Sequence, residues 1–335
     1  MRVVQLQEFG GPEVLTVVEA PDPVPGPGQI VMTVEGAGVN SVDVLTRSGS
    51  YHKAFQPPLI LGSEAAGTIT AVGPDVEELH VGQRVLALGR PNLPGFYAEQ
   101  AAVFAPFVVP VPDEVALIDA AALPIAWGTA WYCLNRLGGL HAGQTVLVHA
   151  AASGVGSAAV QLAAAAGAHV IAAAGGEVKT AWVAELGAEH VLNSQALTGD
   201  RLPARVVELT DGRGADLVLD TVGGEVFAQS LKAVAYGGTV VALANVGLAP
   251  SVIDTRDFYP KNATIRGFQI TNLLEHGYDP RPDLKELLAT LASKAVRVPV
   301  TAVYGLADAA EAHRRLQDRG NYGKVMLAPA GESSR

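Results

Sequence analysis

Hydrophobic and polar residues follow two different patterns along the chain. In the first third, short apolar runs between Pro, Gly and Asp-rich turns predict a small, mostly antiparallel β domain. Its predicted strands are Ile30 to Val34, Gly67 to Val72, Arg84 to Leu88 and Tyr97 to Val103. Apolar residues at helical spacing then predict a linker helix between Ile118 and Leu137.

From Thr145 onward, nearly continuous apolar strands alternate with helices. This alternation predicts a parallel sheet covered by helices on both faces, so the expected fold class is α/β. The predicted strands are Val146 to His149, His169 to Ala173, Leu217 to Thr221, Thr239 to Ala244 and Thr264 to Ile270, with helices from about Ser157, Val178 and Glu225. The final segments are predicted as helix, strand, helix and strand at Asp283 to Lys294, Val300 to Tyr304, Ala307 to Arg319 and Lys324 to Leu327.

Composition narrows the possible function classes. A chain of 335 residues with 49% hydrophobic and 17% charged residues predicts a compact protein of two domains. The net charge is -10 and no long run of Lys or Arg is present, so we expect no nucleic acid as the main partner. Cys133 is the only cysteine, which excludes an intramolecular disulfide and a site of several thiolates and favours the reducing cytoplasm.

The most apolar region, Thr145 to Gly176, contains no Asp, Glu, Lys or Arg. Its glycines, and a switch from strand-like to helix-like periodicity and back, predict a buried β-α-β unit and not a membrane span. The N-terminus has no pattern of a secretory signal, so we expect neither export nor membrane insertion.

The same region carries the strongest local motif, VLVHAAASGVGSAAVQ, in which a strand leads through a small-residue turn into a helix. Such a turn presents backbone N–H groups and the positive end of the helix dipole, which favours a pyrophosphate. Ala151 and Ser153 replace the first two glycines of G-x-G-x-x-G, so a purely structural turn is the alternative. In its strand and helix context the motif predicts a doubly wound Rossmann domain, with Ser153, Gly154, Val155 and Gly156 binding the dinucleotide.

The end of the following strand bears on the choice of dinucleotide. An acidic residue there binds the ribose 2′-hydroxyl of NAD, but this chain has Gly175 and Gly176 after two alanines. A small-residue turn followed by Lys179 admits and neutralises a 2′-phosphate, which favours NADPH over NADH. Glu177 opposes this if it points inward, whereas a solvated acid in the first turn of a helix does not. An ordinary surface lysine is the alternative for Lys179.

Further motifs follow in a fixed order along almost the whole chain. They are Asn40 to Asp43, Arg47 to Tyr51, Leu61 to Gly67, Val81 to Val85, Gly95 to Glu99, Ala121 to Pro124, Gly128 to Ala130, Ser153 to Gly156, Leu186 to Ala188, Gly214 to Asp216, Asp220 to Gly224 and Gly323 to Val325. By these residues the chain resembles the quinone oxidoreductase and zeta-crystallin branch of the medium-chain dehydrogenase/reductase superfamily.

The resemblance implies a GroES-like catalytic domain made of residues 1–122 and 267–335, with a Rossmann nucleotide-binding domain, residues 123–266, between them. It also implies a homodimer. Asn40, Tyr51 and Thr129 are the implied catalytic residues. Beyond the glycine-rich turn, the implied cofactor contacts are Asn40, Thr129, Gly175, Gly176, Lys179, Ser194, Asn245, Phe268 and Lys324.

Zinc-containing relatives place a Cys near Asn40 and a His at the position of Ser63. Because these ligand types are missing, we expect no metal site. Without a Lewis acid, the expected substrate is an acceptor that is already electrophilic, such as a quinone, an enal or an enone. Leu45 replaces a second family tyrosine and Ser194 replaces a tyrosine near the 2′-phosphate.

Several tempting residues have ordinary structural interpretations. Tyr51 either donates to a developing oxyanion or forms an apolar wall. Asp43 is expected to bond the backbone at a helix start, and His52 and His149 to be surface or core residues. Cys133 is expected to be a small buried hydrophobe.

Two rival functions remain at this point. An enoyl-thioester reductase of the same fold acts on a related conjugated acceptor, although no Lys or Arg cluster announces a coenzyme A or phosphopantetheine site. A non-catalytic NADPH-binding protein, similar to the lens crystallins or to an RNA-binding relative, is the second, and the acidic charge weighs against RNA.

Overall fold

The computed structural model describes residues 1–52, 55–89, 95–246 and 248–329. These residues form two compact units: unit 1 is Met1–Gly128 with Leu273–Arg335, and unit 2 is Thr129–Asn272. Residues 330–335, the end of the predicted catalytic domain, lie outside the described residues. None of the helices in the described part of the chain has the length and apolar character that a membrane crossing requires.

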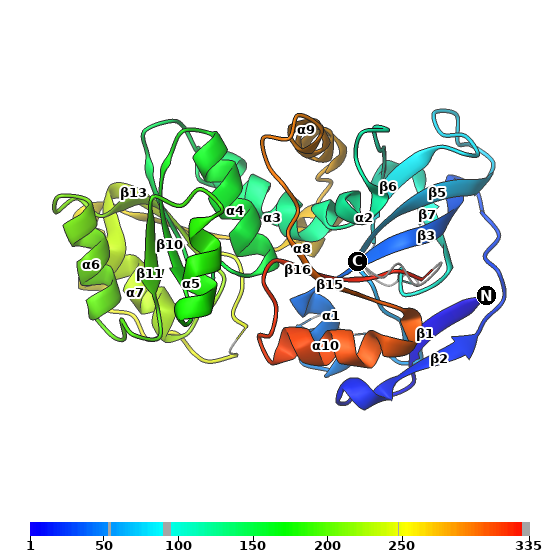
Figure 1. The fold of residues 1–335 in the computed structure, drawn as a ribbon, viewed down its shortest axis with the longest axis horizontal. Helices are drawn as coiled ribbons and strands as arrows, with labels where there is room; N and C mark the ends of the chain where they lie inside the picture. Colours follow the sequence, from blue (N-terminus) through cyan, green and yellow to red (C-terminus); the bar gives the residue numbers. More distant parts are fainter. Residues whose placement is uncertain (53–54, 90–94, 247, 330–335) are drawn as a thin grey trace. The chain divides into compact units, whose positions relative to one another are not determined.

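Within its described residues, unit 2 is built on a parallel sheet of six strands in the order β11-β10-β9-β12-β13-β14. The strands are β9 (Thr145–Val148), β10 (His169–Ala174), β11 (His190–Asn193), β12 (Ala215–Asp220), β13 (Val234–Ala242) and β14 (Thr264–Gly267). Helices α4 (Gly154–Ala165) and α5 (Glu177–Ala184) cover one face, and α6 (Arg201–Leu209) and α7 (Glu225–Ala233) cover the other (Figure 1). The predicted doubly wound Rossmann sheet is confirmed.

The sheet of unit 2 explains why its strands are almost entirely apolar. Every residue of β9 is buried, because helices cover both faces of a parallel sheet. Leu147, Ile171, Val218 and Val240 lie in one core cluster. Strand order reverses between β9 and β12, and ligands of doubly wound folds bind outside the carboxyl ends of the strands at such a reversal.

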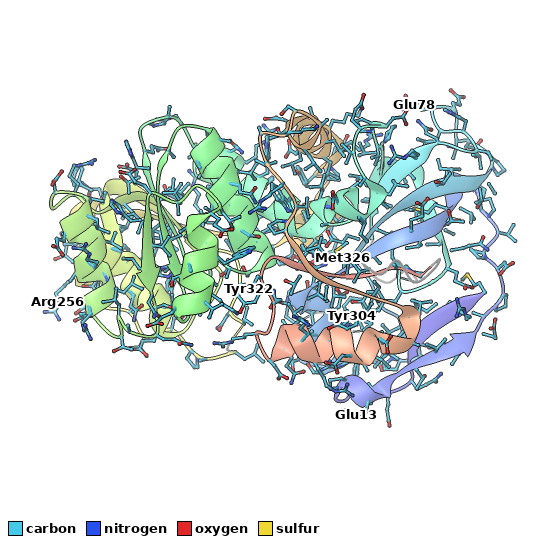
Figure 2. The ribbon with its side chains drawn as sticks, viewed as in Figure 1. Glu13, Glu78, Arg256, Tyr304, Tyr322 and Met326 are labelled. Carbon is cyan, nitrogen blue, oxygen red and sulfur yellow. The ribbon has the colours of Figure 1, made fainter. Side chains whose placement is uncertain are left out.

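Unit 1 is the β-rich part of the chain. One sheet of its described residues has the order β15-β16-β3-β5-β6-β8, with β7 paired to β3, and a second has the order β2-β1-β4. The bounds are β1 Arg2–Leu6, β2 Leu15–Glu19, β3 Gln29–Val39, β4 Leu59–Ile60, β5 Glu64–Val72, β6 Arg84–Leu88, β7 Gln100–Phe104, β8 Val108–Pro110, β15 Val300–Tyr304 and β16 Lys324–Leu327. Tyr304 and Met326 mark the two C-terminal strands in Figure 2. Pairing of β16 with β3 places Val325–Leu327 in the same sheet as the N-terminal strands of unit 1.

The remaining elements are mostly short. The α-helices are α1 Ser41–Arg47, α2 Leu117–Ala120, α3 Gly128–Tyr132, α8 Ile270–Glu275, α9 Arg281–Ala292 and α10 Ala309–Gln317. The 3-10 helices are η1 Pro12–Val14, η2 Ala105–Phe107, η5 Thr255–Asp257, η6 Tyr259–Lys261 and η7 Leu306–Asp308.

The helix predicted between Ile118 and Leu137 is confirmed in part: the chain is continuously helical from Leu123 to Leu137, but α2 is separate and the helix is not α-helical throughout. This stretch consists of α2 and α3 with two π-helical segments, η3 (Leu123–Trp127) and η4 (Cys133–Leu137). Pro124 has no N–H group with which to continue the bonding of α2, so the backbone changes its pattern there. The strand predicted from Thr264 to Ile270 was too long, because β14 ends at Gly267 and α8 begins at Ile270.

A buried polar cluster joins α10 to α1 and to the segment before β7. His313 is fully buried, and its Nε2 lies 3.1 Å from the Tyr97 hydroxyl while its Nδ1 lies 3.3 Å from Arg47 Nη1. Arginine can only donate, so Nδ1 accepts and the ring proton is on Nε2. Burial, together with the charge of Arg47, lowers the pKa of His313 to about 3.

This shift predicts a specific pH dependence of stability. The unfolded chain binds a proton at residue 313 below about pH 6.5, whereas the folded chain does so only near pH 3, so the free energy of unfolding falls as pH is lowered through this window. Between pH 7 and pH 5 the contribution of His313 is about 2 kcal/mol. Denaturant titrations of wild type and His313→Gln should show a shallower acid dependence in the variant. Parallel curves, offset by a constant, would contradict the assignment.

Candidate functional site

The turn between β9 and α4 has the geometry of a phosphate-binding turn. Ser153 is the N-cap of α4, and its hydroxyl accepts a hydrogen bond from the Gly156 N–H at 3.0 Å. A Cβ atom on Gly156 would lie 2.3 Å from the Ala150 carbonyl oxygen, so no larger residue fits. The start of this 12-residue helix carries the N–H groups and dipole that attract an anion. The local structure therefore fits the pyrophosphate of a dinucleotide.

The side chains of Asp220 and His149 lie at the carboxyl ends of β12 and β9, next to this turn. Asp220, at the end of β12, accepts hydrogen bonds from the N–H groups of Val222 at 2.8 Å and Gly223 at 2.9 Å. Its other oxygen accepts from the Ser230 hydroxyl at 2.9 Å, which fixes the turn that follows β12. His149 is buried, as expected, and its Nε2 has no hydrogen-bond partner within the described ranges. Burial lowers the pKa of His149, while the charge of Asp220 opposes the shift, so the ring is neutral at pH 7.

The turn after β10 is the predicted adenosine end. Gly176 has a φ of 81° and is the N-cap of α5, so a residue with a side chain would be strained there. Glu177 is exposed at the first position of α5, which agrees with the interpretation of a solvated acid. Lys179 is half-buried, and the Ser194 N–H donates to the Ala174 carbonyl at 2.9 Å. The structure thus brings Gly175, Gly176 and Ser194 to one edge.

Three further predicted contacts belong to unit 2. Thr129 is buried in α3, and the Phe268 ring lies 5.4 Å from that of Tyr132 between centroids. Asn245 is exposed, and its amide donates to the Ala249 carbonyl at 2.8 Å. Because the Phe268 N–H bonds the carbonyl at the end of β13, Phe268 lies at the same sheet edge as the phosphate-binding turn.

In unit 1, Asn40 is part of a buried ionic cluster that also contains Glu64 and Lys324. The Lys324 ammonium donates to Glu64 Oε1 at 2.6 Å and to Asn40 Oδ1 at 2.7 Å. The Asn40 amide nitrogen donates to the same Glu64 oxygen at 2.9 Å, and the Ile125 N–H donates to the other at 2.6 Å. Glu64 and Lys324 are 0% and 2% exposed, so this is a fully desolvated ion pair. Both ends of the Asn40 amide are held in one orientation.

Asp43 lies beside this cluster and has the structural role that the sequence predicts. One carboxylate oxygen accepts from the Asn40 N–H at 2.9 Å, which caps α1, and the other accepts from the Ser63 hydroxyl at 3.0 Å. Burial raises the pKa of Asp43 to about 6, although these two hydrogen bonds oppose the shift.

Tyr51 is half-buried, whereas Cys133 is fully buried. The Tyr51 ring packs against His52 with centroids 4.3 Å apart and against Phe55 at 6.0 Å. His52 is exposed. Cys133 is fully buried, and burial raises the pKa of its thiol far above the usual value, so the expectation of a small buried hydrophobe is confirmed.

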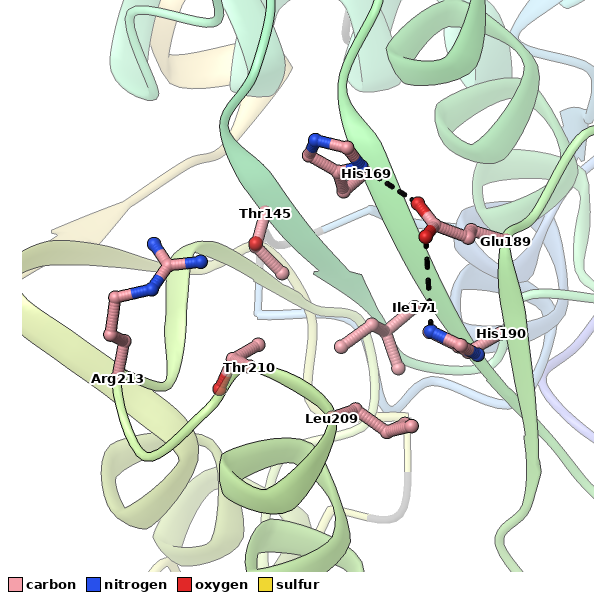
Figure 3. A pocket seen from close by; sticks show the side chains of 8 residues that line it. All are labelled: Thr145, His169, Ile171, Glu189, His190, Leu209, Thr210 and Arg213. Atoms are coloured by element: carbon pink, nitrogen blue, oxygen red, sulfur yellow. Dashed lines mark hydrogen bonds and ion pairs between the residues drawn. The ribbon is translucent and has the colours of Figure 1, made fainter.

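A hollow opens at the opposite edge of the sheet in unit 2. It is lined by Thr145, His169, Ile171, Glu189, His190, Leu209, Thr210 and Arg213 (Figure 3). Glu189 joins the two histidines, with oxygens 2.7 Å from His169 Nδ1 and 3.9 Å from His190 Nε2. Because Thr145 and His169 begin β9 and β10, the hollow lies at the amino ends of the strands, away from the phosphate-binding turn.

Comparison with known proteins identifies the family. The model of the alcohol dehydrogenase GroES-like domain matches residues 26–113, and that of zinc-binding dehydrogenases matches residues 154–293. The chain is 32% identical to a quinone oxidoreductase of Mus musculus, over 98% of this chain and 97% of that protein. The chain belongs to the medium-chain dehydrogenase/reductase superfamily, in the branch of the quinone oxidoreductases. The resemblance drawn from the sequence motifs is confirmed.

Two other relatives of this medium-chain reductase are informative. The crystal structure of the Escherichia coli quinone oxidoreductase complexed with NADPH matches with a TM-score of 0.90 and 28% identity, over 98% of this chain and 100% of that one. A phenolphthiocerol/phthiocerol polyketide synthase of Mycobacterium tuberculosis is 33% identical, over 97% of this chain. The chain spans only 15% of the length of that synthase, so it matches one segment of a much longer protein.

Sequence reasoning missed two features of this medium-chain reductase. The motifs contain Glu64 and Lys324, but nothing local indicates that residues separated by 260 positions form a buried ion pair. Asn193 is the other, because its side chain bonds the turn after β10. A polar amide directly after Val191 and Leu192 is the only local signal for it.

Proposed function

We propose that the chain is an NADPH-dependent oxidoreductase that reduces quinones or other conjugated carbonyl compounds without zinc. The observation that supports it best is the end of β10, where Gly175 and Gly176 stand in place of an acidic residue and Glu177 is exposed. A carboxylate there would repel a 2′-phosphate, whereas the glycine turn leaves room for one. When bound, NADPH supplies a hydride from its nicotinamide ring.

Each unit, taken by itself, contains residues that we propose as contacts of this cofactor. Ser153, Gly154, Val155 and Gly156 would hold the pyrophosphate at the start of α4. Gly175, Gly176, Lys179 and Ser194 would receive the adenosine 2′-phosphate, and Asn40, Thr129, Asn245 and Phe268 would contact the nicotinamide. We propose unit 1 as the catalytic domain and unit 2 as the nucleotide-binding domain.

Zinc independence is supported by the bonding of Glu64. Three donors, from Lys324, Asn40 and Ile125, already occupy its two oxygens, and the Lys324 cation neutralises the charge that would attract a metal. Asn40 and Ser63 stand where zinc-containing relatives place Cys and His, and the matched zinc-binding dehydrogenase model, residues 154–293, does not include them. We propose that Lys324 affects the bound cofactor indirectly, because its ammonium holds the Asn40 side chain in place.

Positioning, not acid-base chemistry, is the proposed contribution of the chain to the reaction. The fixed amide of Asn40 orients a bound ring, because neither of its ends can rotate without breaking a buried hydrogen bond. Tyr51 either donates a hydrogen bond from its hydroxyl group to a developing oxyanion or forms an apolar wall with Phe55.

The proposal is tested by following NADPH and NADH oxidation with quinones, enals and enones. We expect turnover with at least one acceptor class and a preference for NADPH, without loss of activity after dialysis against a chelator. Binding of NADPH without turnover of any acceptor would favour the non-catalytic alternative. Metal in stoichiometric amounts in the purified protein would contradict zinc independence.

Lys179→Ala tests the 2′-phosphate contact directly. Removal of a cation that pairs with a phosphate costs about 1.5–3 kcal/mol, so the KM for NADPH should rise roughly 10-fold or more. NADH has no 2′-phosphate, and its KM should be nearly unchanged. Lys285→Ala, in α9 of unit 1, is a matched control for the loss of one positive charge. Equal effects of Lys179→Ala on both cofactors would refute the contact.

Reduction of an enoyl thioester is the second candidate function. It is favoured by the match to the polyketide synthase, which covers 97% of this chain. Both functions use the same electrophilic chemistry, in which a hydride adds to a carbon conjugated with a carbonyl group. Crotonyl thioesters of coenzyme A and of N-acetylcysteamine, compared with crotonaldehyde and a benzoquinone, separate the two. A much higher kcat/KM for the thioesters would establish the second function.

We further propose a homodimer formed through unit 2. Strand β14 is the last strand in the sheet order, all four of its residues are exposed, and it carries the apolar Ile265. An exposed strand edge of this kind pairs readily with a second copy. Sedimentation velocity should give twice the 34.5 kDa mass of the chain. A monomer at micromolar concentration would refute the dimer.

A further inference from the structure

Asn193 links the two loops at the proposed adenosine end. It is the last residue of β11 and pairs in register with Ala174, the last residue of the neighbouring parallel strand β10. Its Oδ1 atom accepts two hydrogen bonds, from the Gly176 N–H at 3.1 Å and from the Gln195 N–H at 3.0 Å. One amide oxygen therefore ties the turn after β10 to the segment after β11.

The two loops also pack against each other. A Cβ atom added to Gly175 would lie 3.4 Å from Gln195 Nε2, and one added to Gly176 would lie 3.3 Å from Gln195 Oε1. The Gln195 side chain thus covers both glycines, and the Ser194 N–H bonds the Ala174 carbonyl. Because the Gly176 N–H is directed at Asn193, the shape of this turn depends on an acceptor at position 193.

We propose that Asn193 is a positioning and specificity-determining residue for the 2′-phosphate of NADPH. It acts through Gly176 and Gln195 by holding the Gly175–Gly176 turn and the Ser194–Gln195 segment as one loop pair. This inference rests on the proposed use of NADPH.

The side chain at position 193 must accept two N–H bonds without adding charge. Both partners are donors, so Oδ1 faces them, and an aspartate would accept the same two bonds. Aspartate would also place a negative charge beside the turn that is proposed to receive the 2′-phosphate, and this charge would repel the phosphate. A neutral amide therefore accepts both hydrogen bonds and does not repel the doubly charged 2′-phosphate.

Two substitutions separate shape from charge. Asn193→Asp keeps both acceptor bonds and adds a charge, and Asn193→Ala removes both bonds and adds none. Asn262→Asp is the matched control, because Asn262 is exposed in unit 2 and belongs to none of these loops. Fluorescence titration gives Kd for NADPH and NADH at low and high salt, and kcat is measured at saturating NADPH.

We expect Asn193→Asp to raise Kd for NADPH about 10-fold or more, with much of the loss recovered at high salt because the repulsion is screened. Its Kd for NADH should change less than about 3-fold. Asn193→Ala should raise Kd for NADPH about 5-fold or more at either salt concentration, because the shape of the loop is lost. Neither variant should change kcat, and Asn262→Asp should resemble wild type.

If both Asn193 variants keep the ratio of NADPH to NADH affinity of wild type, the inference is wrong while NADPH use stands. If both variants weaken the binding of NADPH and of NADH by the same factor, Asn193 has a general structural role and the inference is also wrong. If the wild-type protein itself binds NADH as tightly as NADPH, the proposed cofactor preference fails, and this inference fails with it.

Discussion

Replacing Lys324 with methionine is expected to lower the free energy of unfolding by about 3–5 kcal/mol, the usual cost of leaving one partner of a buried ion pair alone. Methionine preserves most of the side-chain volume but not the ammonium. Glu64 would remain as a fully buried carboxylate that, among the described residues, keeps its donors from Asn40 and Ile125. The Asn40 Oδ1 atom would lose its 2.7 Å bond to Lys324 as well. Urea or guanidinium titration at pH 7 measures the loss.

A double variant distinguishes an unpaired charge from poor packing. Glu64→Gln in the Lys324→Met background removes the charge, so much of the lost stability should return and the two substitutions should be strongly non-additive. Lys232→Met is the matched control, because its ion pair with Asp200 is exposed and such pairs contribute about 0–1 kcal/mol. If Lys324→Met costs no more than Lys232→Met, the cluster is not a stabilising ion pair.

The strands with strong local signals could be predicted from the sequence. Arg84–Leu88, Val300–Tyr304 and Lys324–Leu327 have the same bounds in the structure as in the prediction. Each is an apolar run limited by Gly, Pro or charged residues, which is sufficient to fix both the type and the ends of a strand. The parallel sheet followed from the alternation of such strands with helices.

Elements with mixed signals were missed. Strand β11 is four residues long and only Leu192 is buried, so no apolar run announces it. Helix α6 has Pro203 in its first turn, a residue that reads as a helix breaker although it is tolerated there. Helix α4 was predicted to begin near Ser157 but begins at Gly154, because the cap by Ser153 extends it into the glycine turn.

In the candidate site, too, local motifs could be predicted from the sequence and long-range contacts could not. The turn between β9 and α4, which we propose to bind the pyrophosphate, is a local motif, so the sequence alone is sufficient to predict it. The contacts of Lys324 with Glu64 and Asn40 form only when β16 pairs with β3 at the other end of the chain. Asn193 reaches Gly176 because β10 and β11 are neighbours, which no local pattern states. Long-range pairing, not residue type, determines these contacts.

Gly156→Ala is expected to weaken NADPH binding by about 100-fold or more, equivalent to roughly 2.7 kcal/mol. The added methyl group would lie 2.3 Å from the Ala150 carbonyl oxygen and 2.7 Å from the Ala151 Cα atom. Both are backbone atoms that cannot rotate away, so the start of α4 must move from the end of β9. That movement breaks the 3.0 Å bond between the Gly156 N–H and Ser153 and displaces the N–H groups proposed to bind the pyrophosphate.

Folding and binding are measured separately to interpret this variant. Overpacking of this kind costs about 1–3 kcal/mol of stability, which thermal denaturation reports, while fluorescence titration gives Kd for both cofactors. NADPH and NADH share the pyrophosphate, so Gly156→Ala should weaken the binding of both cofactors equally. Lys179→Ala, in contrast, should weaken the binding of NADPH alone. Gly305→Ala is the control, because nothing lies within 4 Å of its added Cβ and its φ of -73° suits alanine. A folded Gly156→Ala protein that binds NADPH as tightly as Gly305→Ala would show that the pyrophosphate binds elsewhere.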